Sequence, residues 1–196
     1  MPPAANGGQI ERIDAGGGNR FVYKTSNGAD NPDISPDSKW VLFSAFSEGQ
    51  HRIMRMPIEG GDVQILTDYR ANEPRYSRDG TRFACFMPNE TTVFWTKVAI
   101  VPAEGGKPIS MFDAPQATNN GRGPIWTSDD SGITVVIAEG EKQNLWLLPV
   151  DGSPGKRMTN FDVPGTARRE YSRDGKRIAL IRAEGIRNAI IITDFR

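Results

Sequence analysis

The residues that could support catalysis are few and lie far apart in the sequence. His51 is the only histidine, and it lies in the polar stretch of residues 48–52. A histidine-based triad needs a nucleophile beside the imidazole, and the sequence has no Gly-x-Ser-x-Gly elbow. We therefore interpret His51 as a residue of a solvated loop, and we predict no catalytic residue and no enzymatic activity for this chain.

Metal and cofactor sites are equally poorly supported. The single histidine and the single cysteine, Cys85, are too far apart for a zinc site, and Cys85 stands in an apolar run typical of a buried strand. Asp129 and Asp130 could bind a hard cation, but acidic residues at a turn are also explained by hydrogen bonds to the backbone. No Lys-Ser or Lys-Thr directly follows the glycines at 16–18, so a hairpin turn is favoured over a phosphate site. We predict neither metal nor cofactor.

Composition excludes further classes. Lys plus Arg and Asp plus Glu both number 24 in 196 residues, so the chain lacks the basic excess of nucleic-acid or anionic-membrane binders. It also lacks an apolar run long enough to span a membrane, and residues 1–8 do not resemble a signal peptide. We expect a soluble chain with no nucleic-acid partner and no direct membrane insertion. The 21 glycines and 14 prolines indicate many turns.

An internal repeat organises the sequence. Four segments align, at residues 31–38, 73–80, 123–130 and 168–175, and each carries a hydroxyl residue followed two positions later by aspartate. The hydroxyl residues Ser35, Ser77, Thr127 and Ser172 are 42, 50 and 45 positions apart. Ser-x-Asp-Gly between two apolar runs is typical of a tight reversal, because aspartate bonds to the backbone and glycine accepts positive φ. Each repeat therefore begins with a β-hairpin.

The runs after these turns decide the fold. They occupy residues 40–43, 83–86, 133–136 and 178–181 and are apolar at successive positions. A strand that is apolar on both faces must be covered on both faces, as it is where each sheet packs between two neighbours. Further strands and Gly-rich turns complete an antiparallel meander. We predict an all-β protein, a β-propeller of about four four-stranded antiparallel blades, or an arc of a larger ring.

The expected organisation begins with a flexible lead-in at 1–8 and a partial blade or closing strand at 9–30. The blades follow at 31–67, 73–112, 123–159 and 168–196. The last blade lacks an outer strand, which the strand near residues 20–23 could supply. Three arrangements remain open: a small closed ring, an arc belonging to a longer protein, and self-association of two chains into one ring. We favour the arc.

The repeat resembles a known family. Pro-x-x-Ser-x-Asp-Gly, an apolar strand, Met-Pro-x-Glu-Gly-Gly and a strand ending in Leu-Thr are similar to the WD-related repeat of TolB-like propellers, over about residues 9–194. The third unit departs from the pattern at 128–131. Similar repeats occur in prolyl-oligopeptidase-type enzymes and in the C-terminal propellers of bacterial serine/threonine kinases, whose kinase motifs are absent here.

The resemblance implies a scaffold for protein–protein or ligand recognition, as the sensor part of a bacterial signalling protein such as a kinase. The alternatives are the gating propeller of a prolyl-oligopeptidase-type hydrolase and a stand-alone TolB-like periplasmic protein. A TolB-like or membrane-anchored parent would place the chain outside the cytoplasm. The sequence itself leaves the location unknown.

Two groups of residues are candidates for binding a protein or peptide. Phe94 and Trp95 stand in a long connection, and the alternative, which we slightly favour, is that they begin a longer core strand. Four arginines precede or lie within the first strands of the repeats, where they could form a basic ring for a carboxylate or acidic peptide. The alternative is that these arginines are solvated and paired with Glu73 and Glu170. The four are Arg70, Arg122, Arg168 and Arg169.

Overall fold

The structure is a computed structural model that describes residues 9–17, 20–24, 28–88, 95–114, 123–162, 166–172, 174–184 and 186–193. All regular secondary structure in these residues is β-strand, so the all-β prediction is confirmed. In this part of the chain, no helix is long and apolar enough to cross a membrane. The predicted lead-in at 1–8 lies outside the described residues.

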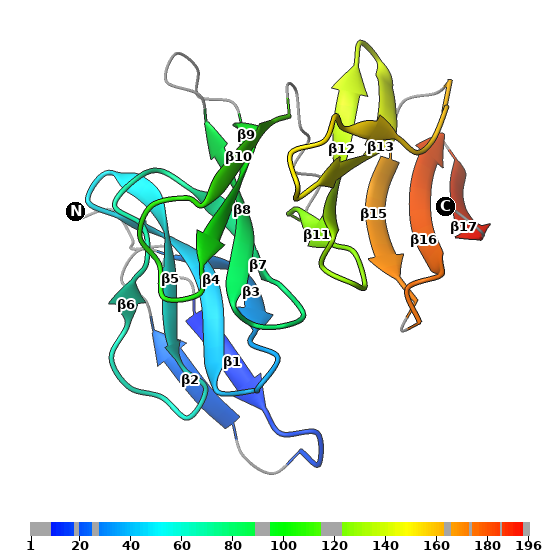
Figure 1. The fold of residues 1–196 in the computed structure, drawn as a ribbon. Coiled ribbons are helices and arrows are strands. Elements are labelled where there is room, and N and C mark those ends of the chain that lie inside the picture. Colours follow the sequence, from blue (N-terminus) through cyan, green and yellow to red (C-terminus); the bar gives the residue numbers. More distant parts are fainter. Residues whose placement is uncertain are drawn as a thin grey trace, which may run out of the picture.

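The described strands form antiparallel sheets that follow one another along the chain (Figure 1). We call the first, two-stranded sheet the half-blade and the next four sheets blades 1 to 4. The half-blade contains β1 (Gln9–Ile13) and β2 (Arg20–Lys24), and blade 1 contains β3 (Ala29–Ile34), β4 (Trp40–Ser47), β5 (Gln50–Pro57) and β6 (Gln64–Ile65). Blade 2 contains β7 (Asn72–Tyr76), β8 (Arg82–Pro88), β9 (Trp95–Pro102) and β10 (Ser110–Asp113), and blade 3 contains β11 (Ile125–Trp126), β12 (Gly132–Glu139), β13 (Lys142–Pro149) and β14 (Lys156–Arg157). Blade 4 contains β15 (Thr166–Tyr171), β16 (Arg177–Glu184) and β17 (Ile186–Thr193). The half-blade, in blue, and blade 4, in orange and red, lie at opposite ends of this row (Figure 1).

The second strand of each inner blade contributes to two cores. In β8, Phe83 and Cys85 join a cluster with blade 1, whereas Ala84 and Phe86 join a cluster with blade 3. In β4, Leu42 faces blade 2 while its neighbours face the half-blade. All five side chains are at most 1 % exposed. The period-2 alternation of a strand thus explains why these runs are apolar at every position.

Blade 4 departs from this pattern. In β16, Ile178 and Leu180 are buried, but Ile181 is 39 % exposed. The prediction that residues 178–181 are covered on both faces is therefore wrong. The reason is that no described sheet packs on the far side of blade 4.

The first strands of neighbouring blades lie side by side. β3 contacts β7, and β7 contacts β11. Asn31 and Glu73 occupy equivalent bulges in β3 and β7, each at φ +54°. Gly123 stands at the corresponding place before β11, where a Cβ would lie 2.3 Å from the Glu73 carbonyl oxygen. Only glycine allows the two chain segments to approach this closely.

The half-blade packs against blade 1 and does not complete blade 4. β2 pairs with β1 along five residues, and Ile10 of β1 is buried against Val41 and Phe43. Among the described strands, β17 pairs only with β16. The closure in which the strand near residues 20–23 completes the last blade is thus not formed, because that strand is held in the sheet at the opposite end of the row.

Candidate functional site

The β3–β4 turn forms one wall of a crevice between blades 1 and 2. Ser35 Oγ donates a 2.6 Å hydrogen bond to Asp37 Oδ1 and accepts one of 2.9 Å from the Trp40 amide. Asp37 Oδ1 also accepts the Lys39 amide at 3.1 Å. These hydrogen bonds to its charged form hold the pKa of Asp37 below the ordinary value. The Ser-x-Asp pair is therefore part of the turn itself.

The same hydroxyl–carboxylate contact recurs in the other blades. The pairs are Ser77 and Asp79 at 2.6 Å, Thr127 and Asp129 at 2.7 Å, and Ser172 and Asp174 at 2.6 Å. Hydrogen bonds lower the pKa of each aspartate, and that of Asp129 falls to about 2. The third repeat keeps the turn although its sequence departs from the pattern.

Asp130 joins blade 3 to blade 2. It stands at φ +56°, and its carboxylate accepts the amides of Arg78 at 2.9 Å and Asp79 at 3.0 Å. Both Asp129 and Asp130 are thus engaged by backbone amides, as the structural alternative predicted. No group of three or more potential metal ligands occurs within the described residues.

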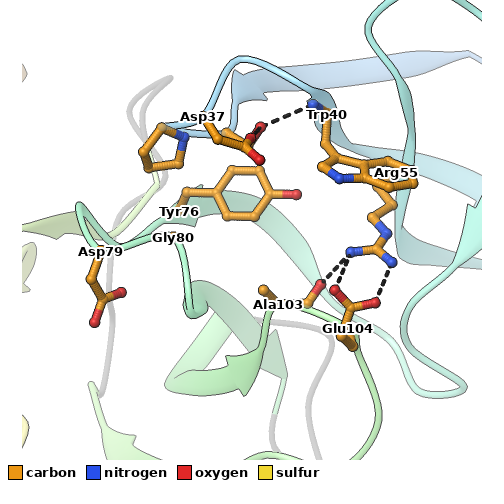
Figure 2. Close-up of a pocket in the computed structure, with 10 residues that line it drawn as sticks. Asp37, Trp40, Arg55, Tyr76, Asp79, Gly80, Ala103 and Glu104 are labelled. Carbon is orange, nitrogen blue, oxygen red and sulfur yellow. Dashed lines mark hydrogen bonds and ion pairs between the residues drawn. The ribbon is translucent and has the colours of Figure 1, made fainter.

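The crevice itself has a volume of about 410 Å³ (Figure 2). One side comes from blade 1 and the other from blade 2, so the site exists only when the two blades pack together. Its lining residues are Ser35, Pro36, Asp37, Trp40, Arg55, Tyr76, Asp79, Gly80, Ala103 and Glu104.

The positively charged residue that lines this crevice is Arg55, and several contacts fix its side chain. Its side chain is 7 % exposed, and the guanidinium lies over the Trp40 ring, 4.2 Å from the ring centroid. Nε donates to Gln64 Oε1 at 2.9 Å, and Nη1 donates to the Ala103 carbonyl at 3.2 Å. Both terminal nitrogens donate to the Glu104 carboxylate. The hydrogen bond to Glu104 raises the pKa of Arg55, so its charge is permanent.

Tyr76 closes the base of the crevice. The residue is 8 % exposed, and its ring belongs to the core between blades 1 and 2. In Figure 2 its hydroxyl points into the space beside Arg55 and Trp40. This oxygen is buried beside the Arg55 guanidinium, and the hydroxyl proton has no acceptor among the described residues. Burial raises the pKa of Tyr76 to about 12, so the hydroxyl stays protonated at neutral pH and can act as a hydrogen-bond donor.

The interface between the half-blade and blade 1 repeats part of this arrangement. Arg12 of β1 donates to the Ile58 carbonyl at 3.1 Å and pairs with Glu59 at 2.7 Å, as Arg55 does with Ala103 and Glu104. We call the Arg12–Glu59 contact the first clasp and the Arg55–Glu104 contact the second clasp. Ile34, 55 % exposed, stands where the second clasp has Tyr76.

The predicted arginine ring is only partly described. Arg169 is 4 % exposed, and its Nη2 donates to the Gly123 and Thr134 carbonyls of the blade 3 segment at 3.0 and 2.7 Å. Burial lowers the pKa of Arg169 to about 10. The guanidinium thus links two blades from inside, and its predicted role in binding a partner stays a prediction. Arg122 and the side chain of Arg168 lie outside the described residues.

The structure brings Arg70 and Trp95 together. The Arg70 guanidinium lies 4.8 Å from the centroid of the Trp95 ring, and Trp95 is the first residue of β9. The alternative that Trp95 begins a strand is therefore confirmed, while Phe94 lies outside the described residues. Partner binding by Arg70 and Trp95 stays a prediction.

His51 and Cys85 have structural surroundings. His51 lies in β5 rather than in a loop, and its ring meets Phe46 edge-on with centroids 5.6 Å apart. Cys85 is fully buried, and burial raises the pKa of its thiol to about 12. A thiol in this state is a poor nucleophile.

Sequence reasoning missed Arg55, Tyr76 and Glu104. One signal was present, because Arg55 interrupts the apolar run at residues 53–56 and Glu104 belongs to the repeated Glu-Gly-Gly turn. Their proximity could not be seen, because it depends on how the blades stack.

Comparisons with known proteins support the fold. No family model matches the chain. Atu1656, an uncharacterized protein of Agrobacterium fabrum, is 27 % identical over 132 residues, which are 63 % of this chain and 44 % of that protein. The uncharacterized peptidase YuxL of Bacillus subtilis is 26 % identical over 107 residues, 55 % of this chain and 15 % of the peptidase. The chain thus matches less than half the length of these curated relatives.

Solved structures of the same shape are propellers. TolB from Acinetobacter baumannii superposes with a TM-score of 0.71 at 19 % identity, over 94 % of this chain and 46 % of TolB. A TolB-like protein from Agrobacterium tumefaciens gives 0.73 at 18 %, over 95 % and 70 %. The β-propeller domain of the Trilobed protease from Pyrococcus furiosus gives 0.67 at 16 %, over 96 % and 62 %. The predicted resemblance to TolB-like β-propellers is therefore confirmed at the level of the fold.

Proposed function

We propose that this chain is a non-catalytic β-propeller module that recognises a protein or peptide partner, and that the crevice between blades 1 and 2 takes part in this recognition. The observation that carries the proposal is the Tyr76 hydroxyl, which is buried, finds no acceptor for its proton among the described residues, and points into a crevice beside Arg55. Propellers commonly use such surface features for binding, and fold alone assigns no chemistry.

The hydroxyl is costly for the fold. A buried polar group without a hydrogen bond costs about 1–3 kcal/mol. The equivalent position holds Ile34 in blade 1, Trp126 in blade 3 and Tyr171 in blade 4. The Trp126 indole nitrogen donates to the Arg75 carbonyl at 3.0 Å, and the Tyr171 hydroxyl forms a hydrogen bond with Thr134. Packing of the blades thus does not require an unsatisfied hydroxyl here. A group that weakens the fold and faces a crevice is expected to bind something.

The crevice suits a peptide better than a nucleic acid. Its volume of about 410 Å³ falls in the range of small-ligand sites and can hold one or two side chains. The Asp37 and Asp79 carboxylates line it, and their lowered pKa values keep them ionised at neutral pH. Fixed negative charges repel a phosphate backbone.

Selection from a displayed library of random twelve-residue peptides tests the proposal. Selected peptides are synthesised, and their affinities for the wild-type chain and for Tyr76→Phe are measured by calorimetry. Since a hydrogen bond to a charged group contributes about 1.5–3 kcal/mol, we expect Tyr76→Phe to weaken binding about tenfold or more. The proposal is wrong if no peptide is selected, or if the selected peptides bind both forms equally.

The wider context of the module extends this proposal. The sequence resemblance favours the sensor part of a bacterial serine/threonine kinase on the extracytoplasmic side, and self-association would cover the exposed face of blade 4. An exposed sheet face that carries Ile181 favours such pairing. Light scattering of the purified chain tests it, because a monomer at all concentrations excludes the two-chain ring.

A second candidate role is the propeller of a peptidase. The similarity to the peptidase YuxL and to the propeller of the Trilobed protease favours it. In that role the module would control access to a hydrolase domain. Sequencing the parent gene distinguishes the two: a Gly-x-Ser-x-Gly hydrolase domain in the same reading frame supports the peptidase role, and a kinase domain supports the sensor role.

A further inference from the structure

Two hydrogen-bond donors of the crevice are arranged as a receptor for an acidic group. The Arg55 guanidinium is fixed by the Trp40 ring and by Gln64, so it is positioned before any ligand arrives. The Tyr76 hydroxyl points into the same space and has no acceptor among the described residues. A carboxylate has two oxygens and about four acceptor sites, so one carboxylate can accept hydrogen bonds from both groups.

The acidic side chain that now occupies Arg55 is replaceable. Glu104 reaches Arg55 from the β9–β10 turn, and its side chain is 79 % exposed. Its ion-pair partner among the described residues is Arg55, and the Tyr76 hydroxyl donates no hydrogen bond to it. Glu104 therefore satisfies the guanidinium but leaves the second donor unused. An incoming carboxylate that engages both donors has an advantage that Glu104 lacks.

We infer that the crevice between blades 1 and 2 binds a carboxylate of its ligand on Arg55 and Tyr76, and that Glu104 is a built-in competitor that the ligand displaces. This inference rests on the proposed function and names the chemical group recognised. The first clasp serves as an internal comparison, because Arg12 pairs with Glu59, and also with Asp14 at 3.3 Å, beside Ile34, which offers no second donor.

The other charges around the crevice limit the ligand to a single acidic group. Asp37 and Asp79 line the crevice, and their nearest cations, Lys39 and Arg82, lie 3.7 Å from the respective carboxylates. Several adjacent negative charges on a ligand would meet these carboxylates. A single carboxylate, either the side chain of an aspartate or glutamate or the C-terminus of a peptide, fits this pattern.

Binding of defined peptides to variants of Glu104 tests the inference. The probes are acetyl-Ala-Glu-Ala-amide for a side-chain carboxylate, acetyl-Ala-Ala-Ala with a free C-terminus, and acetyl-Ala-Gln-Ala-amide as the uncharged control. Affinities are measured by calorimetry at constant ionic strength, with folding of each variant checked by circular dichroism. Removing the competitor in Glu104→Ala is expected to increase the affinity for one of the two acidic probes about tenfold, and which probe gains identifies the source of the carboxylate.

Three variants make the result specific. Glu59→Ala opens the first clasp and is expected to give no gain, because Ile34 adds no donor. The double change Glu104→Ala with Tyr76→Phe is expected to lose most of the gain. Glu104→Gln keeps a neutral acceptor and is the alternative if Glu104→Ala does not fold, with an expected gain of about fivefold.

The outcomes separate this inference from the proposed function. The inference is overturned if neither Glu104 variant gains affinity, if Glu59→Ala gains as much, or if the uncharged control binds equally well. Library peptides that bind wild type but are indifferent to Glu104 would overturn the carboxylate site and leave the recognition module intact. If neither the library peptides nor the acidic probes bind, the proposed function and the inference both fail.

Discussion

The two clasps join neighbouring sheets in the same way but have different surroundings. In the first, Arg12 of the half-blade meets Glu59 beside Ile34, over an apolar hollow of about 280 Å³. In the second, Arg55 of blade 1 meets Glu104 beside Tyr76, in the crevice between blades 1 and 2. The ion pair is thus a device for holding sheets together. At the second clasp, Tyr76 and the β3–β4 turn add a crevice with an unused hydrogen-bond donor.

The largest expected effect comes from breaking the turn that carries the second clasp. Gly105 stands at φ +88°, and a Cβ there would lie 2.5 Å from the Leu66 carbonyl oxygen of blade 1. Gly105→Ala must therefore displace the turn, and we expect a loss of about 2–4 kcal/mol in the free energy of unfolding. Gly106→Ala is the matched control, because Gly106 also has positive φ but opens onto free space; it should cost about 1 kcal/mol. Equal losses in urea denaturation would contradict the close approach.

Removing each arginine compares the two clasps directly. Methionine retains the apolar stem of the side chain but loses the charge and its hydrogen bonds. Since the Arg55 side chain is 7 % exposed and that of Arg12 is 18 % exposed, Arg55→Met should lower the free energy of unfolding by about 2 kcal/mol and Arg12→Met by about 1 kcal/mol. The same denaturation experiment measures both. A larger loss for Arg12→Met would show that the first clasp is the stronger one.

A smaller effect of opposite sign is expected at Tyr76. Because its hydroxyl is buried without a hydrogen bond to a described residue, Tyr76→Phe should raise the free energy of unfolding by up to about 1 kcal/mol. Tyr69→Phe is the control, since the Tyr69 hydroxyl donates to the Gly106 carbonyl at 3.0 Å and its loss should destabilise the fold by about 1 kcal/mol. If Tyr76→Phe is as destabilising as Tyr69→Phe, the hydroxyl is structural.

The smallest effect is a pH dependence of the second clasp. The hydrogen bond from Arg55 lowers the pKa of Glu104 below the ordinary value of a glutamate in the folded state. A lowered folded pKa stabilises the protein above the unfolded pKa, and this contribution disappears as the pH falls through the folded value. The melting temperature of wild type should therefore exceed that of Glu104→Gln at pH 6, and the difference should shrink below about pH 4. A constant difference between pH 6 and pH 3 would contradict the assignment.

The fold was accessible from the sequence because its determinants are local. Ser35 and Asp37 make the first turn of a blade from residues two positions apart, and the same spacing recurs in every repeat. The apolar runs that follow these turns likewise indicate strands that can be covered on both faces. The run that includes Ile181 was misjudged, since composition shows that a strand could be covered but not whether a neighbour is present.

The site was not accessible because its parts are distant in sequence. Arg55 and Glu104 are 49 residues apart and meet only where two blades stack. Arg169 was predicted to belong to a basic ring for an acidic partner, yet it replaces the proline found in the other three repeats and is buried against blade 3. Arginine in a position otherwise held by a small apolar residue was the one hint of that burial.

The alternation of side chains in β4 and β8 has a consequence for how the protein opens. Each of these strands belongs to two hydrophobic clusters, so neither cluster can be lost without disturbing the next. Stability is then transmitted from sheet to sheet as in a linear array with nearest-neighbour coupling. Fraying should start at the half-blade and at blade 4, whose outer faces lack a described neighbour, and blade 2 should exchange its amide protons last.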